Sequence, residues 1–281
     1  MTRRWIGGVF GNTIGTDTDF GNTRGVFSME QQYYLLQEGG WGPAVGGAEI
    51  NPASNAKQIY DTGNRVNGIY WLKHGSGSAY QAYCWIDANS GGGYQLVGKI
   101  DSGNPSAWKW SGSNWSATSA VNESNCQDLT NTSGLNRGYY EYTLVTGFRM
   151  GLHSSAVSTV TNYLSEAKTG NTAKHFFTNQ SSCQNGRSDF KSWLSGAGLD
   201  NSFNSNYDSA QANCNSSGFA NSTPSSNTRW GTTGNNESDC NSNDSCIGFG
   251  GTASGCNMAA GGEMTHPANL DRFGIGYIFV Q

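Results

Sequence analysis

The chain has 281 residues, of which only 13% are charged and 40 are glycine, about twice the usual share of glycine. Nine Trp, 13 Tyr and 12 Phe can fill a hydrophobic core, which excludes a disordered chain. The formal net charge of −4, without a basic cluster beyond Arg3-Arg4, excludes a nucleic-acid partner. No apolar run approaches the roughly 20 residues that insert into a membrane as a helix. We therefore expect short strands joined by many ordered loops.

The N-terminal stretch and the cysteines point to different compartments. The apolar residues 5–10 are interrupted by Gly7-Gly8 and are too few for a signal peptide. Seven cysteines in a loop-rich chain are nevertheless typical of oxidising compartments. A protein made in a cytoplasm that works outside it, as in a virus particle released by lysis, reconciles both observations. A chain whose signal has been removed is the alternative.

Residues 1–52 are expected to form a separate N-terminal segment. Ser28, with Gln31 three residues later, forms a capping box, and Gly39-Gly40 provides a stop. The sequence therefore predicts a helix over residues 29–38, followed by a linker.

The patterns "WIGGVFGNT" and "GVFSMEQQYYLLQEGGW" lie within this segment. They resemble N-terminal segments of structural proteins in tailed bacteriophages, which recur there in front of unrelated C-terminal domains. The resemblance implies a virion location, attachment to other virion proteins through residues 1–52, and an oligomer in the particle.

The stretch from Ser54 to Gly103 contains a compact group of predicted elements. The glycines at residues 91–93 allow positive φ and close packing of the backbone beneath the strand that follows. The aromatic and β-branched residues favour strands, and "HGSGS" favours a hairpin turn. The predicted elements are a helix at Ala56–Tyr60 capped by Ser54, and strands at Gly68–Lys73, Ala79–Ile86 and Tyr94–Ile100.

Two motifs lie far apart in the sequence. The first is a G-x-Y-x-L strand, a Y-Q-x-Y-C strand and "GGGYQLV"; the second is "SDCNSNDSCIGFGGTASGC" at Ser238–Cys256. Together they resemble the fibrinogen-like domain, specifically that of the intelectins. The resemblance implies an α+β domain over residues 53–281, with a twisted, mainly antiparallel sheet and long loops. The stretch Phe273–Val280, "FGIGYIFV", fits its last strand.

The resemblance also implies calcium, which intelectins use to hold exocyclic diols of microbial sugars. Carried over by position, Asn241 keeps the family's amide ligand, while Asn243 and Asp244 replace its Glu and His. With Asp239, these oxygens are expected to bind calcium; the alternative is a solvated polar loop. Between Cys256 and Phe273 the family's sugar-contacting aromatics are missing. The ligand-binding candidates there are Glu263, His266 and Asp271.

The cysteines also depart from the family pattern. Cys84 lacks its usual partner, which falls on Ala56, so a buried free thiol is expected. The other six cysteines are expected to form three disulfides, among them Cys183–Cys240 and Cys126–Cys256. A zinc site is the competing interpretation, and its ligands would be Cys240, Cys246, Cys256 and His266.

No catalytic motif is found, so the chain is not expected to be an enzyme. The four histidines lie in no nucleophile or zincin pattern and are expected to be surface or hydrogen-bonded residues. Val157, Val160 and Leu164 predict a short amphipathic helix within Ser154–Lys168.

Two hypotheses follow. In the first, the chain is a tail or head fibre protein whose lectin-like domain recognises host cell-surface glycans. In the second, it is a structural decoration or tail-assembly protein without a ligand. The first is favoured because extracellular recognition is what the family resemblance implies.

Overall fold

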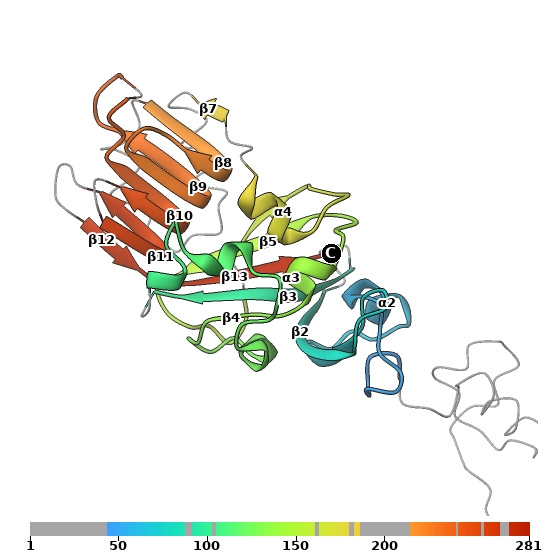
Figure 1. The fold of residues 1–281 in the computed structure, drawn as a ribbon. Coiled ribbons are helices and arrows are strands. Elements are labelled where there is room, and N and C mark those ends of the chain that lie inside the picture. Colours follow the sequence, from blue (N-terminus) through green and yellow to red (C-terminus); the bar gives the residue numbers. More distant parts are fainter. Residues whose placement is uncertain are drawn as a thin grey trace, which may run out of the picture.

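The computed structural model describes residues 44–87, 92–102, 105–160, 163–179, 183–185, 214–239, 241–253, 256–264 and 270–281. The predicted helix over residues 29–38 lies outside these ranges. Two antiparallel sheets dominate the described part of the chain (Figure 1). Strands hold 44% and helices 15% of the described residues.

The first sheet, here called the central sheet, has the order β1-β2-β3-β13-β5-β6, and β4 pairs with β3. The C-terminal strand β13 thus lies between β3 and β5, which come more than 100 residues earlier in the chain. The strands of the central sheet are β1 Gly68–Leu72, β2 Tyr80–Asp87, β3 Gly92–Asp101, β4 Gly134–Leu135, β5 Phe148–His153, β6 Leu164–Glu166 and β13 Ile275–Val280.

The second sheet, here called the meander sheet, has the order β12-β11-β10-β9-β8-β7, in which sequence neighbours are also neighbours in space. Its members are β7 Cys183–Asn185, β8 Cys214–Ser222, β9 Ser226–Asn235, β10 Ser245–Ala253, β11 Cys256–Met264 and β12 Leu270–Phe273. The helices in the described ranges are α2 Ala56–Asp61, α3 Gly138–Glu141, α4 Ala173–Thr178 and the 3₁₀ turns η2 Pro105–Ala107, η3 Ser113–Ser116 and η4 Glu123–Gln127. None of these helices is long and apolar enough to cross a membrane.

The elements predicted for Ser54–Gly103 are confirmed with small shifts at their ends. Helix α2 is capped one residue later than expected, because the Asn55 side chain accepts a 2.9 Å hydrogen bond from the Gln58 N–H. Strands β1 and β2 form the predicted antiparallel hairpin, and β3 pairs with β2. The predicted C-terminal strand is confirmed as β13.

The glycines at the start of β3 have the role that the sequence indicated. Gly92 has a φ of +123°, in the region that glycine occupies without steric cost. A Cβ on Gly93 would lie 2.0 Å from the Ala56 carbonyl oxygen, so only glycine lets β3 pass this close to α2.

A row of glycines crosses the meander sheet. Gly218 pairs with Gly231, Gly231 with Gly248 and Gly248 with Gly261. All four have φ between +137° and +147°. A Cβ on Gly231 would lie 2.0 Å from the Ile247 carbonyl oxygen, so neighbouring strands approach along this row as only glycine permits.

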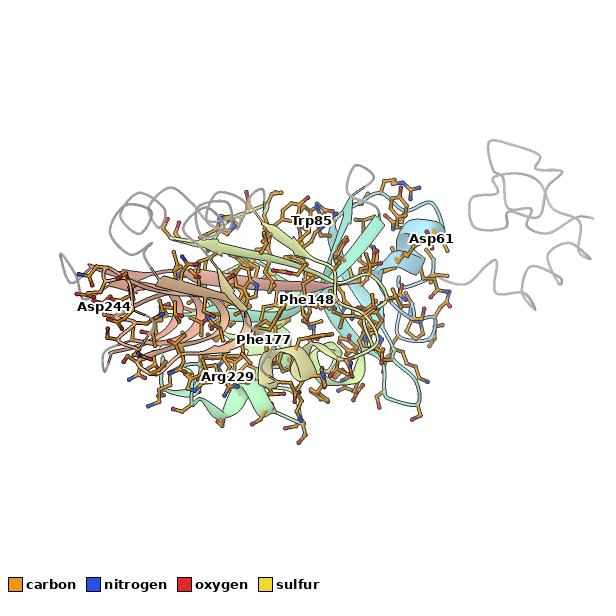
Figure 2. All side chains as sticks on the ribbon, turned by 90° about the horizontal axis from the view of Figure 1, so that it is seen from above. Asp61, Trp85, Phe148, Phe177, Arg229 and Asp244 are labelled. Carbon is orange, nitrogen blue, oxygen red and sulfur yellow. The ribbon has the colours of Figure 1, made fainter. Side chains whose placement is uncertain are left out.

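An aromatic row lies next to the glycines and faces the central sheet. Phe219 pairs with Trp230, and Trp230 pairs with Phe249. Phe249 packs so closely on β13 that a Cβ on Gly276 would lie 2.5 Å from its ring. Phe219 meets Phe148 of β5 with ring centroids 4.9 Å apart, and Figure 2 shows Phe148 in the middle of the molecule. The main core therefore lies between the two sheets.

The other face of the central sheet carries a second cluster, which includes Trp85, Tyr277 and Phe279. Arg149 is buried within this face. Its guanidinium lies 3.9 Å from the ring centroid of Tyr94 and 4.9 Å from that of Trp85. The central sheet thus carries a hydrophobic cluster on each face.

The predicted α+β class is wrong, because the described chain is mainly β. The resemblance implied one sheet with long loops, but the Gly-, Ser-, Thr- and Asn-rich stretches after residue 213 supply strands β8 to β11 of a second sheet.

The helix predicted within Ser154–Lys168 is also wrong. Val157 and Val160 pack on the outer face of the central sheet, whereas Leu164 lies in β6 and packs against the main core. The three apolar residues serve opposite faces of one sheet, so no single helix face contains them.

Candidate functional site

The predicted calcium ligands lie in the loop between β9 and β10, at one end of the meander sheet. In Figure 2, Asp244 lies at the opposite end of the molecule from Asp61 of α2. Asp239 and Asn241 are exposed, whereas Asn243 and Asp244 are buried. The four residues are therefore brought into one loop but into two different environments.

Asp239 holds the loop together. Its carboxylate accepts 2.9 Å hydrogen bonds from the Asn241 N–H and from the Ser242 hydroxyl. These bonds hold the pKa of Asp239 below its usual value, and the bond from Asn241 has the largest effect. One oxygen of this carboxylate is thus already occupied by the loop itself.

Asn243 presents a buried oxygen. Its side chain is fully buried, and its Nδ2 donates to the Thr233 hydroxyl at 3.2 Å. Within the described residues its Oδ1 accepts no hydrogen bond. A buried amide oxygen without a donor is costly, which makes it a candidate ligand for a cation.

Asn235 at the end of β9 has the same character. Its Nδ2 donates to the Asp239 carbonyl at 2.8 Å and to the Ser242 hydroxyl at 3.1 Å, while its Oδ1 has no donor in the described part of the chain. The Asp244 N–H donates to the Gly234 carbonyl at 3.1 Å, which places Asp244 beside Asn235 across the two strands. The sequence analysis missed Asn235, because only the strand register brings it to the loop.

These oxygens suit a hard cation. Calcium is bound by carboxylate and amide oxygens, and the residues at this loop that carry such oxygens in buried side chains are Asn235, Asn243 and Asp244. No group of three or more His, Cys, Asp or Glu side chains that could hold a metal occurs among the described residues. A site with so little negative charge would bind calcium weakly, in the range of about 10⁻⁴ to 10⁻³ M that extracellular modules show.

Two of the other ligand candidates, Glu263 and Asp271, have their backbone at the same end of the sheet. Glu263 of β11 pairs in register with Asp271 of β12, and Ser245, next to Asp244, pairs with Met264. His266 lies outside the described residues. The register thus brings the backbone of two of the three candidates near the β9–β10 loop.

No family model matches the chain, and no curated protein matches it. The candidate site therefore rests on the contacts of its own residues.

The predicted Cys126–Cys256 disulfide is wrong. Cys126 is a free, fully buried thiol on the outer face of the central sheet, whereas Cys256 belongs to the meander sheet on the opposite side. Burial raises the pKa of Cys126 to about 12. Cys84 is also buried and free, as expected. Cys240 and His266 lie outside the described residues, and with them the Cys183–Cys240 pair and part of the alternative zinc set.

Proposed function

We propose that the chain is a non-enzymatic, lectin-like protein of a bacteriophage particle that recognises glycans on the host surface with the help of calcium. Residues 1–52, by their resemblance to phage structural proteins, would attach it to other virion proteins. The meander sheet would present the β9–β10 loop to the glycan.

The observation that carries the proposal is the pair of buried amide oxygens of Asn235 and Asn243 beside the buried Asp244. When bound, calcium would supply positions for two sugar hydroxyl oxygens. Asp239 keeps the loop in shape, and Thr233 orients the Asn243 amide so that its oxygen stays available.

Binding of the full-length chain to a microbial glycan array, with calcium and with a chelator, tests the proposal. We expect chelator-sensitive binding that weakens at least tenfold in Asp244→Asn. Asn243→Asp should bind calcium more tightly by calorimetry, because it adds a carboxylate ligand. Asp61→Asn, an exposed carboxylate at the other end of the molecule, is the matched control.

Equal binding in chelator would overturn the role of calcium. A folded chain that binds no glycan would overturn the lectin function and favour the structural alternative.

The exposed side chains of Ile50 and Val66 favour that alternative, in which the domain packs on neighbouring subunits. It predicts that Ile50→Asp weakens self-association of the full chain in sedimentation experiments, with no glycan binding by either form.

A further inference from the structure

A groove of about 460 Å³ lies on the outer face of the central sheet, which is the face that carries the cluster with Trp85, Tyr277 and Phe279. None of its lining residues belongs to the β9–β10 loop. The residues after η4 and the stretch around Val157 cover the middle of this face, but they leave Ile69 of the edge strand β1 exposed and Tyr83 of the neighbouring β2 partly exposed. The groove is lined by Gly68, Ile69, Tyr83, Gln127, Asp128, Leu129, Thr130, Ala156, Val157 and Ser158. Its volume is in the range of small-molecule sites.

The floor of the groove is apolar. Ile69 pairs in register with Tyr83, so the two side chains lie side by side on one face of the hairpin. Ile69 is 51% exposed, although it is large and aliphatic. The Tyr83 ring is held edge-on by Phe279, with centroids 6.3 Å apart. Burial, and then the neighbouring Cys84, raise the pKa of Tyr83, so its hydroxyl keeps its proton near neutral pH.

One edge of the groove offers backbone groups. The Trp71 N–H donates to Gly46 and its carbonyl accepts from Ala53, so both groups of Trp71 point away from β2. Two residues earlier, the N–H and carbonyl of Ile69 therefore point the same way. Within the described residues neither has a hydrogen-bond partner.

Asp128 supplies a fixed carboxylate at the rim. Its Oδ1 accepts hydrogen bonds from the buried Lys99 ammonium at 2.5 Å, the Thr130 N–H at 2.9 Å and the Thr130 hydroxyl at 2.6 Å. Partial burial raises the pKa of Asp128, but the bonds from Lys99 and Thr130 outweigh it and hold the pKa below its usual value. The side chain is 54% exposed, and its Oδ2 accepts no hydrogen bond from the described residues.

We propose that this groove is a second glycan-binding site, which holds a neutral pyranose ring without a metal ion. Its C–H face would pack on Ile69 and Tyr83, and a hydroxyl would donate to Asp128 Oδ2, as charge-assisted hydrogen bonds favour. The charge of Asp128 is already paired with Lys99, so the groove offers hydrogen-bond acceptance rather than a site for a basic side chain. A purely apolar ligand would bury the Asp128 Oδ2 without giving it a hydrogen-bond donor, which is unfavourable.

The choice of a sugar as ligand rests on the proposed lectin function, but the site and its independence from calcium do not. The test uses saturation-transfer NMR on the full-length chain in chelator, with the methyl glycosides of glucose, galactose, mannose and N-acetylglucosamine as probes. We expect transfer to at least one glycoside, followed by titration of that probe.

Two substitutions test the groove itself. Ile69→Arg should lower affinity at least tenfold, because the longer, charged side chain fills the groove and removes its apolar floor. Val145→Arg is the matched control, since Val145 is 57% exposed outside the groove. Asp128→Asn should also lower affinity at least tenfold, because a donor replaces Oδ2 while Oδ1 keeps its bonds. Thermal unfolding verifies that each variant is folded.

Affinity unchanged by Asp244→Asn, but lost in Ile69→Arg, supports the groove even if the calcium site fails. No transfer to any of the four glycosides would overturn the proposal, as would affinity that survives Ile69→Arg. Binding of a lysine-rich decapeptide that Ile69→Arg abolishes, without any glycoside signal, would assign the groove to a peptide instead.

Discussion

In the central sheet, every residue of β13 is buried. Its Ile, Tyr, Phe and Val side chains pack into two hydrophobic clusters, one on each face of the sheet. In the meander sheet, β9 is buried at most positions as well, but with Thr, Gly, Asn and Ser around a single Trp230. The two strands are therefore buried to a similar degree with different residue types, large apolar in β13 and small or polar in β9. The removal of apolar surface from water stabilises the central sheet. The meander sheet depends more on close backbone contact and on hydrogen bonds of buried side chains.

The largest effect should come from the place where the two sheets meet. Phe249 of β10 packs on Gly276 of β13, so Phe249→Ala would leave a cavity between the sheets. We expect a loss of about 4 kcal/mol in the free energy of unfolding, measured by urea denaturation. Val66→Ala, at an exposed position, is the control and should cost about 0.5 kcal/mol or less. Equal losses would mean that the sheets do not share one core.

Replacing a glycine of the crossing row tests the backbone contribution directly. Gly231→Ala should cost about 3 kcal/mol or more, because the added Cβ meets the Ile247 carbonyl and the residue has a φ of +147°. Gly75→Ala is the matched control, since Gly75 also has positive φ but open space around it. Thermal unfolding of both variants checks the difference. Equal losses would contradict a cost from the close contact, because Gly75 has no atom within 4 Å of the added Cβ.

The buried hydrogen bonds of the meander sheet make the next contribution. Asn221 is fully buried, and its Nδ2 donates to the Ser216 carbonyl at 2.7 Å while its Oδ1 accepts from the Ser216 hydroxyl at 2.9 Å. Asn221→Ala leaves both groups of Ser216 without these partners, for a cost of about 2 kcal/mol. Hydrogen exchange should show faster opening of β8 and β9 than of β3. Unchanged exchange in β8 would contradict the importance of this network.

The contrast between the sheets explains which parts of the molecule could be predicted. Strands β1, β2, β3 and β13 carry aromatic and β-branched residues between clear turns, so their pattern indicates strands. The meander strands lack apolar alternation, because glycine and small polar residues are buried on them instead. That burial arises from packing between distant segments, which a local pattern does not show.

The candidate sites follow the same rule. Asn243 and Asp244 could be proposed because they share one short loop, whereas Asn235 joins them only through the β9–β10 register. The groove could not be predicted from the sequence either, because Ile69, Asp128 and Val157 come from three separate segments that only the fold brings together. Its Lys99–Asp128 ion pair joins a buried strand residue to a loop residue, and no spacing in the sequence predicts it.

The smallest expected effect is the loss of stability at acidic pH, and we expect it to differ between the two sheets. His74 is buried next to the central sheet, where its Nδ1 lies 2.9 Å from the Ser54 carbonyl oxygen and its Nε2 contacts Tyr80 and Gln95. Burial lowers its pKa from 6.5 to about 4, against the weaker opposing effect of the Ser54 bond. Between these two pKa values the unfolded chain binds more protons than the folded chain, so stability is full above pH 6.5 and falls towards pH 4.

From pH 7 to pH 5 this one group should remove about 1 to 2 kcal/mol of stability. Hydrogen exchange at pH 5, corrected for intrinsic rates, should therefore show α2, β1 and β2 opening before β8 and β9, whose buried Asn, Ser and Thr side chains do not titrate. His74→Gln keeps a hydrogen-bonding side chain without the titration, and it should flatten the difference between the two pH values. If the meander strands open first at pH 5, or if His74→Gln leaves the pH dependence unchanged, then His74 is not the group through which acid acts.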